Sequence, residues 1–393
     1  MIVIERTAWA LLCLLVFSLP WEKSLWIPQI GTVSQLLGII AFAAGAIHAA
    51  ARRSLRRPNA VLLAAGVLCA WFALTYFWSL DRSATVIRIK TFAELLAMTW
   101  LIWNECRGPR RQRQLLSAYV LGAAAGAGIA FWRYAHHQQT YYLRYAATGF
   151  DPNDFGLILA LSVAPALYLL RQEKSRIRWV WAAALVPILP AILLTASRTA
   201  LVATAVALVF GLATWRGAGM AYRTATVLAV AALALGPLLL APAPQRTRLQ
   251  TLPSELHRGT FHGRTLIWKT GLKVFKHHPI LGIGSGAYPE AVAPWLGRPD
   301  VPGAQYVAHN TFLSVLVESG LIGFALFLAL AACLAVSTLT MPMPERALWA
   351  VMLAVWATGV STLTWEQYKP TWLMVALIMT EWSRSWWPAR EKA

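Results

Sequence analysis

The chain has 393 residues, of which 58% are hydrophobic and only 13% are charged, and its formal net charge is +19. Because a soluble domain typically has about 25% charged residues, this composition and the mean hydropathy of +0.54 exclude a soluble globular protein. The basic residues cluster between apolar runs, which is typical of membrane topology signals, so we expect no nucleic-acid partner. The four cysteines lack the spacing of a disulfide framework or a metal site: Cys13, Cys69, Cys106 and Cys333.

Apolar runs of about 20 residues recur along the whole chain. Inside a bilayer each run must satisfy its own backbone hydrogen bonds, so each is expected to be a helix. The expected fold class is an all-α integral membrane protein with about twelve transmembrane helices. The first span is weak because Glu22 and Lys23 interrupt it. The expected spans are 7–27, 30–50, 59–79, 89–106, 114–133, 153–170, 178–196, 199–215, 224–241, 310–336, 347–364 and 371–387.

Three parts of one integrated membrane domain follow from these spans. Residues 1–241 hold helices one to nine, residues 242–309 form a large loop with short helices, and residues 310–393 hold the last three helices and the C-terminus. The loop opens with Pro242 and Pro244, and a loop this long is uncommon unless it has a function.

Within the loop, residues 264–277 have the pattern of an amphipathic helix. Lys269, Lys273 and Lys276 fall on one side and apolar residues on another. Such a helix either lies on a membrane surface among anionic headgroups or packs on the helical bundle, and the sequence leaves both interpretations open.

Basic clusters orient the chain in the membrane. They follow the second, fourth and sixth spans, which places all three on one side, and this side is expected to be cytoplasmic. Both termini then lie in the cytoplasm and the large loop on the opposite face. The N-terminal apolar stretch has no cleavage site after it, so we interpret it as an uncleaved first helix. The clusters are Arg52, Arg53, Arg56 and Arg57; Arg107, Arg110, Arg111 and Arg113; and Arg171, Lys174, Arg176 and Arg178.

Polar groups at the membrane surface mark candidate sites, because ionisable residues at membrane depth are rare and often functional. Arg144 precedes a segment in which Asp151 or Asn153 is expected to cap the following helix. Arg198 lies in a very short connection between two apolar runs. A guanidinium fixed there can bind phosphate through two hydrogen bonds, or it can be a simple interfacial anchor.

Two further positions are on the same face. Arg264 begins the amphipathic segment, and His309-Asn310 directly precedes the tenth span. If the bundle is compact, the arginines and His309 converge, so that the arginines hold a diphosphate and the histidine accepts a proton from an attacking hydroxyl. We expect no metal, because no acidic cluster with ligand spacing occurs on this face. The glycines of 282–286 follow no predicted strand and are interpreted as turn residues.

Several of these blocks together resemble the signature regions of the O-antigen ligase and polymerase superfamily. One block runs from Gly263-Arg264 through Trp268 and Phe275 to His278-Pro279 and Gly284. Others are His309-Asn310-Thr311-Phe312-Leu313 with Glu318 to Gly323, and upstream Arg144 to Asn153 and Ser197 to Ala200. The similarity covers roughly residues 140–330.

The resemblance implies a bacterial inner-membrane glycosyltransferase with its active site on the periplasmic face. Its expected activity is that of an O-antigen ligase, which transfers O-antigen from undecaprenyl pyrophosphate to a sugar hydroxyl of lipid A-core, without metal, nucleotide or other cofactor. His309 is implied as the base, and Arg198 and Arg264 as pyrophosphate ligands. Arg144 fits the pattern less closely, and Asn153 and Asn310 are supporting residues. Direct displacement should invert the anomeric centre.

Other functions remain open at this stage. An O-antigen polymerase would join two carrier-linked glycans, and a further relative glycosylates protein. A twelve-helix lipid-glycan transporter would instead need charges along a path through the bilayer. The basic face of 264–277 favours an anionic lipopolysaccharide acceptor, and membrane lipids are expected partners in each case.

Overall fold

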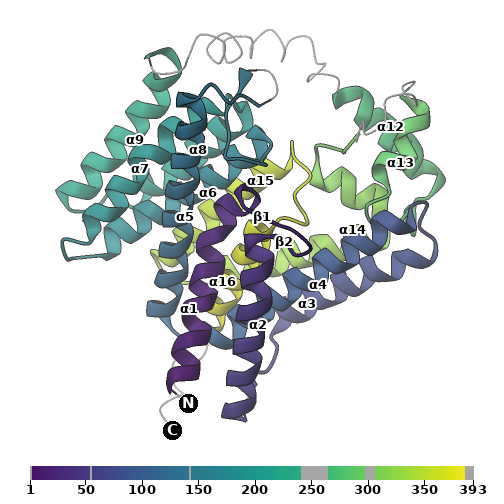
Figure 1. The fold of residues 1–393 in the computed structure, drawn as a ribbon, viewed down its shortest axis with the longest axis horizontal. Helices are drawn as coiled ribbons and strands as arrows, with labels where there is room; N and C mark the ends of the chain where they lie inside the picture. Colours follow the sequence, from purple (N-terminus) through teal and green to yellow (C-terminus); the bar gives the residue numbers. More distant parts are fainter. Residues whose placement is uncertain (1, 54, 141–142, 240–263, 297–305, 386–393) are drawn as a thin grey trace.

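A computed structural model describes residues 2–53, 55–140, 143–239, 264–296 and 306–385 (Figure 1). Pro242, Pro244 and Gly263 of the predicted loop lie outside the described residues. A helix underlies each of the twelve expected spans. These helices are α1 (Ile2–Ser18), α2 (Val33–Arg52), α3 (Ala60–Leu74), α4 (Arg82–Glu105), α5 (Pro109–Ala135), α6 (Pro152–Gln172), α7 (Arg178–Leu194), α8 (Arg198–Ala213), α9 (Met220–Leu239), α14 (Thr311–Leu339), α15 (Glu345–Val360) and α16 (Lys369–Ser385).

Shorter elements connect these helices. Helix α1 ends at Ser18, and the chain continues as a 3-10 helix through Pro20 and the charged Glu22 and Lys23. A small antiparallel hairpin of two-residue strands follows. The shorter elements are η1 (Leu19–Ser24), β1 (Trp26–Ile27), β2 (Gly31–Thr32), η2 (Thr75–Phe77), α12 (Arg264–His277), α13 (Tyr288–Val292) and η5 (Ala293–Trp295).

Six helical segments within the described residues are long and apolar enough to cross a membrane. They are Ile2–Ser24, Val33–Arg52, Ala60–Phe77, Pro109–Ala135, Pro152–Gln172 and Thr311–Leu339. Three shorter apolar helices lie in α7, α8 and α9. The chain is therefore a helical membrane protein, as predicted, while the twelve crossings and the periplasmic location of the large loop stay predictions.

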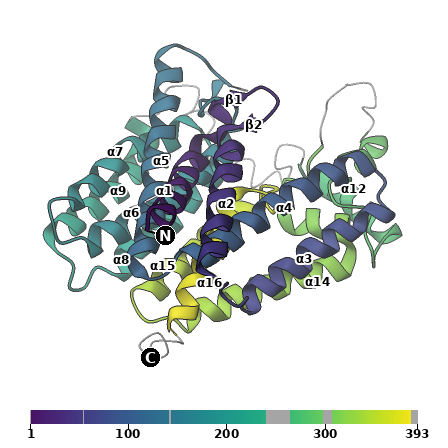
Figure 2. The ribbon, with the colours of Figure 1, turned by 60° about the horizontal axis from the view of Figure 1, so that its bottom comes forward.

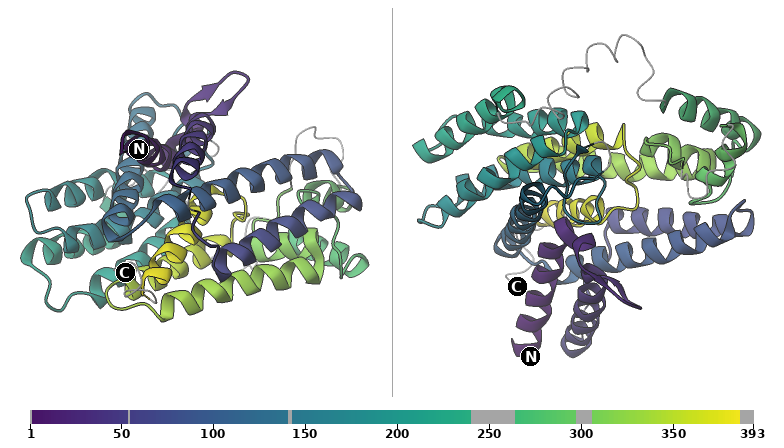
Figure 3. Two further views of the ribbon diagram at one scale, coloured as in Figure 1. Left: turned by 90° about the horizontal axis from the view of Figure 1, so that it is seen from below. Right: turned by 45° about the horizontal axis from the view of Figure 1, so that its top comes forward.

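The helices form two groups joined by a central set. In Figure 1, α5 to α9 lie on one side and α3, α4, α12, α13 and α14 on the other, with α1, α2, α15 and α16 between them. Figure 2 shows α3, α4 and α14 running side by side, and the two views of Figure 3 show the same separation. Helix α6 is the most enclosed of these six segments, since 89% of its apolar window is buried. It packs against α5, α7, α8 and α15 and forms the centre of the first group.

A kink in α14 joins the loop region to the bundle. Gly320 has φ 66° and ψ −171°, and a Cβ there would lie 2.1 Å from the carbonyl oxygen of Ile280. The backbone N–H of Gly284 donates to the carbonyl of Glu318 at 2.9 Å, and that of Gly286 donates to the Glu318 carboxylate at 2.7 Å. Because Gly282, Gly284 and Gly286 all have positive φ, they are turn glycines that pack against the kink, as predicted.

Helix α12 has the bounds that its amphipathic pattern predicts, Arg264–His277. Its buried face packs on α13 and on the first part of α14, where the Tyr288 hydroxyl donates to the carbonyl of Ile267 at 3.0 Å. Lys269, Lys273 and Lys276 are exposed on the opposite side. The helix therefore packs on the bundle and presents a basic face outward.

Candidate functional site

Four helices begin close to the residues that the sequence singled out. Asn153 lies in the first turn of α6, Arg198 is the first residue of α8, Arg264 is the first residue of α12, and Asn310 caps α14. The first backbone N–H groups of a helix have no partner inside the helix, and the helix dipole adds partial positive charge there. Helix starts that carry arginines are therefore suited to bind a phosphate or diphosphate.

The segment 361–368 between α15 and α16 ties three of these helix starts together. An Nη of Arg264 donates to the carbonyl of Thr362 at 3.0 Å, and the hydroxyls of Thr362 and Thr199 lie 2.7 Å apart. The Thr311 hydroxyl, at the start of α14, donates to the carbonyl of Leu363 at 2.8 Å. The segment thus holds the starts of α8, α12 and α14 in one place.

The same segment also contacts the start of α6. The carboxylate of Asp154 accepts from the indole N–H of Trp365 at 2.9 Å and from the hydroxyl of Tyr368 at 2.5 Å. The Trp365 and Tyr368 rings are stacked 4.8 Å apart. The ammonium of Lys23 lies 5.1 Å from the Tyr368 ring and 5.2 Å from the Phe150 ring. All four helix starts are therefore linked through 361–368, a segment that the sequence analysis did not identify.

The charges of Arg264 and Asp151 both act on His309. Its backbone has φ 47°, an uncommon conformation for a residue with a side chain. The indole N–H of Trp268 fixes this turn by donating to the carbonyl of Ala308 at 2.8 Å. Burial first, and then the positive charge of Arg264, lower the pKa of His309 to about 4, while Asp151 acts in the opposite direction. The imidazole is therefore neutral at pH 7, able to accept a proton but weakly basic.

Arg144 is 4% exposed and forms an internal link. Its Nε donates to the carbonyl of Thr195 at 2.7 Å, and an Nη donates to the Asn153 side-chain oxygen at 2.7 Å. It thereby fixes the turn before Arg198 to the start of α6. This geometry favours a positioning role, and the direct phosphate contact predicted for Arg144 stays a prediction.

Capping explains the positions of the remaining predicted residues. The Asp151 carboxylate accepts from the backbone N–H of Asn153 at 2.7 Å. Of the two residues expected to cap α6, Asp151 and Asn153, it is therefore Asp151 that does so. The Asn310 side chain accepts from the backbone N–H of Leu313 at 3.0 Å and caps α14. The side chains of Asn153 and Asn310 therefore support the arrangement of the helix starts.

Two buried acids lie at the edge of this region and were not singled out as site residues. Glu318 and Glu366 are 5% and 6% exposed. The positive charge of Arg88 on α4 interacts electrostatically with both carboxyl groups. Burial raises the pKa of Glu366, against the effect of Arg88. Glu366 could have been found in the sequence as an acidic residue that lies between two expected apolar spans. Among the described residues, no group of three or more histidines, cysteines or acids has the spacing to hold a metal ion.

Two comparisons with known proteins each match part of the chain. Residues 183–328 match the family described as O-antigen ligase, and this segment contains Arg198, Arg264 and His309. A stretch of 72 residues is 38% identical to the exopolysaccharide production protein ExoQ of Rhizobium meliloti (strain 1021), and it covers 17% of this chain and 17% of that relative. Over the matched segment, the chain is therefore similar to proteins of an O-antigen ligase-type family.

Proposed function

We propose that the protein is an O-antigen ligase, a glycosyltransferase that moves O-antigen from undecaprenyl pyrophosphate to a sugar hydroxyl of lipid A-core. The observation that carries this proposal is the link from Arg264 through Thr362 to Thr199, which brings the starts of α8 and α12 together near His309. In the proposed topology the site faces the periplasm from the inner membrane, both termini lie in the cytoplasm, and the reaction uses no metal or other cofactor.

The reaction follows from the charges at the helix starts. The donor diphosphate lies at the N-termini of α8 and α12, where Arg198 and Arg264 offset its negative charge. The acceptor oxygen attacks the anomeric carbon and transfers its proton to a ring nitrogen of His309. The bond from the anomeric carbon to the diphosphate oxygen breaks, the electron pair leaves with the diphosphate, and the anomeric centre is inverted.

Donor binding should also raise the pKa of His309, the proposed base. In the free protein, Arg264 helps to hold the pKa of His309 near 4. A bound diphosphate brings negative charge beside both groups, which favours the protonated imidazole. His309 is therefore more basic when the donor is present than when it is absent, which limits proton uptake to the productive complex.

A polymerase is the second candidate. The partial relative is named for exopolysaccharide production, and such a role favours a second carrier-linked glycan as acceptor. The exposed lysines of α12 suit any anionic acceptor. A transporter fits less well, because the candidate charges gather at helix starts and do not line a path through the bundle.

Transfer by the purified full-length protein tests these alternatives. The protein is reconstituted with undecaprenyl-pyrophosphate glycan, with and without rough lipopolysaccharide, beside His309→Ala and a His136→Ala control at an exposed position. The ligase proposal expects product only with lipopolysaccharide, and only in the wild type and the control. Longer carrier-linked chains without lipopolysaccharide would establish a polymerase, and the absence of covalent product from folded protein would leave the transporter.

A further inference from the structure

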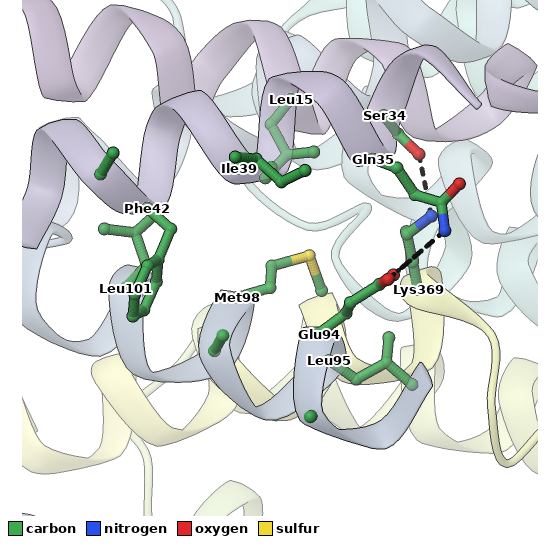
Figure 4. A pocket seen from close by; sticks show the side chains of 14 residues that line it. Leu15, Ser34, Gln35, Ile39, Phe42, Glu94, Leu95, Met98, Leu101 and Lys369 are labelled. Atoms are coloured by element: carbon green, nitrogen blue, oxygen red, sulfur yellow. Dashed lines mark hydrogen bonds between the residues drawn. The ribbon is translucent and has the colours of Figure 1, made fainter. Parts of the chain in front are cut away.

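An apolar groove lies on the other side of Lys369, between α1, α2, α4 and the start of α16. It encloses about 430 Å³, and its walls include Leu15, Ile39, Met98 and Leu101 (Figure 4). Ile39 is 64% exposed, so the groove opens outward from the bundle. In a membrane protein, a surface of this kind faces hydrocarbon chains.

One end of the groove is polar. The Lys369 ammonium donates to the Glu22 carboxylate at 2.5 Å and to the Ser34 hydroxyl at 2.8 Å. The Gln35 amide reaches the two oxygens of Glu94 at 3.4 and 3.5 Å (Figure 4). Two carboxylates and one ammonium leave a formal charge of −1 at this end. An ammonium has three N–H donors, and two of those of Lys369 are used by Glu22 and Ser34 among the described residues. The third can donate to a further acceptor.

Glu94 is the unusual group in this cluster. It lies within α4, its side chain is exposed beside the apolar groove, and within the described residues its carboxylate has only the two long contacts from Gln35. A carboxylate that borders the hydrocarbon region is expensive unless a cation or strong donors compensate it. A lipid with a cationic headgroup, bound in the groove, would supply such a cation to Glu94.

We propose that this groove binds a phospholipid with a primary ammonium headgroup, such as phosphatidylethanolamine. The ammonium donates to Glu94, the phosphate accepts from the remaining donor of Lys369, and one hydrocarbon chain lies along Ile39 and Met98. An anionic lipid is disfavoured by the −1 charge at the mouth. A choline headgroup also fits less well, because its quaternary ammonium has no N–H to donate.

A short path of contacts connects the groove to the candidate site. Lys369 directly follows Tyr368, whose hydroxyl binds Asp154 at the start of α6. The lipid would therefore contact the end of the segment that holds the four helix starts.

Two variants and a matched control isolate the groove. Glu94→Gln removes the charge and keeps the shape. Gly38→Leu fills the groove, since a Cβ at Gly38 would have only Leu15 Cδ1 nearby, at 3.9 Å. Gly66→Leu is the control, because this helical glycine has nothing within 4 Å of its Cβ position, so it tests the effect of replacing an outward-facing glycine by leucine.

Lipid binding to the full-length protein in detergent is measured by native mass spectrometry, with phosphatidylethanolamine, phosphatidylcholine, phosphatidylglycerol and a polyprenyl phosphate. We expect phosphatidylethanolamine to bind the wild type and Gly66→Leu about tenfold more tightly than the other lipids, because it alone offers a hydrogen-bonded ammonium to Glu94. Glu94→Gln should remove this preference, and Gly38→Leu should weaken binding. Equal binding of phosphatidylglycerol, an unchanged preference in Glu94→Gln, or preferential polyprenyl phosphate binding that Gly38→Leu removes would each overturn the proposal.

Discussion

Replacing Arg264 by glutamine should raise the pKa of His309. The native value, about 4 against the ordinary 6.5, corresponds to roughly 3 kcal/mol between the two protonation states. Burial is the larger cause and stays in the variant, while the charge of Arg264 is removed. Because Arg264 is the smaller of the two causes that lower this pKa, we expect a rise of about one pH unit.

A substitution at Asp151 should change the pKa of His309 in the opposite direction. Its negative charge raises the pKa of His309, and Asp151→Asn removes that charge while keeping a side chain that can cap α6. This variant should lower the pKa further. The pair of variants therefore moves the same group in opposite directions, which a general loosening of the structure would not do.

The assay is the pH dependence of diethyl pyrocarbonate modification, which requires the neutral imidazole. Modification of the peptide with His309 is quantified by mass spectrometry, with the peptide of exposed His136 as an internal reference for reagent activity. In the wild type, His309 should remain reactive down to about pH 4, and in Arg264→Gln its reactivity should fall at a higher pH. An unchanged or lower midpoint in Arg264→Gln would refute the electrostatic link between these two residues.

Three further predictions concern the framework of the site. Arg144→Ala should destabilise the protein by about 3 kcal/mol or more, because it leaves buried acceptors unpaired; an unchanged melting temperature in detergent would contradict the buried link. Gly320→Ala should lower the melting temperature by several degrees, since its φ is positive and a Cβ would meet a carbonyl, whereas Gly66→Ala should not. Thr199→Val removes the hydrogen bond to Thr362 at constant shape and should reduce kcat/KM for the donor about three- to tenfold, with equal rates counting against a role for 361–368.

The helices were predictable because their signals are local. Apolar runs and flanking charges indicate a helix wherever the chain enters lipid, and the amphipathic pattern of 264–277 gave the bounds of α12. Helix α4 was predicted from residue 89 but begins at Arg82, where the Asp81 carboxylate accepts from the backbone N–H of Ala84 at 3.0 Å. Hydropathy gave only the apolar part of this helix, because its first turns contain basic residues that a capped helix tolerates.

Candidate site residues could be chosen from the sequence only where a charged or polar side chain lies beside the start of a predicted helix. Arg198 and His309 each lie beside the start of an expected span, and Arg264 begins the amphipathic helix of the loop. A charged or ionisable side chain at such a place is visible in the sequence. The role of Thr362 is not, because its contact with Arg264 uses a backbone carbonyl, and every residue carries one. The internal link of Arg144 was missed for the same reason, since one of its partners is the carbonyl of Thr195.

The proposed reaction ends with a protonated His309, and the same electrostatics can return it to the neutral form. While the diphosphate product remains beside Arg264, its negative charge keeps the imidazolium stable. When the product leaves, burial and Arg264 again hold the pKa near 4, so at pH 7 the neutral form is favoured by about a thousandfold. Proton release is thereby linked to product release, and the base regains its neutral state before the next donor binds. A histidine with a fixed pKa near 7 would lack this coupling, because half of it would be protonated whether or not the donor was present.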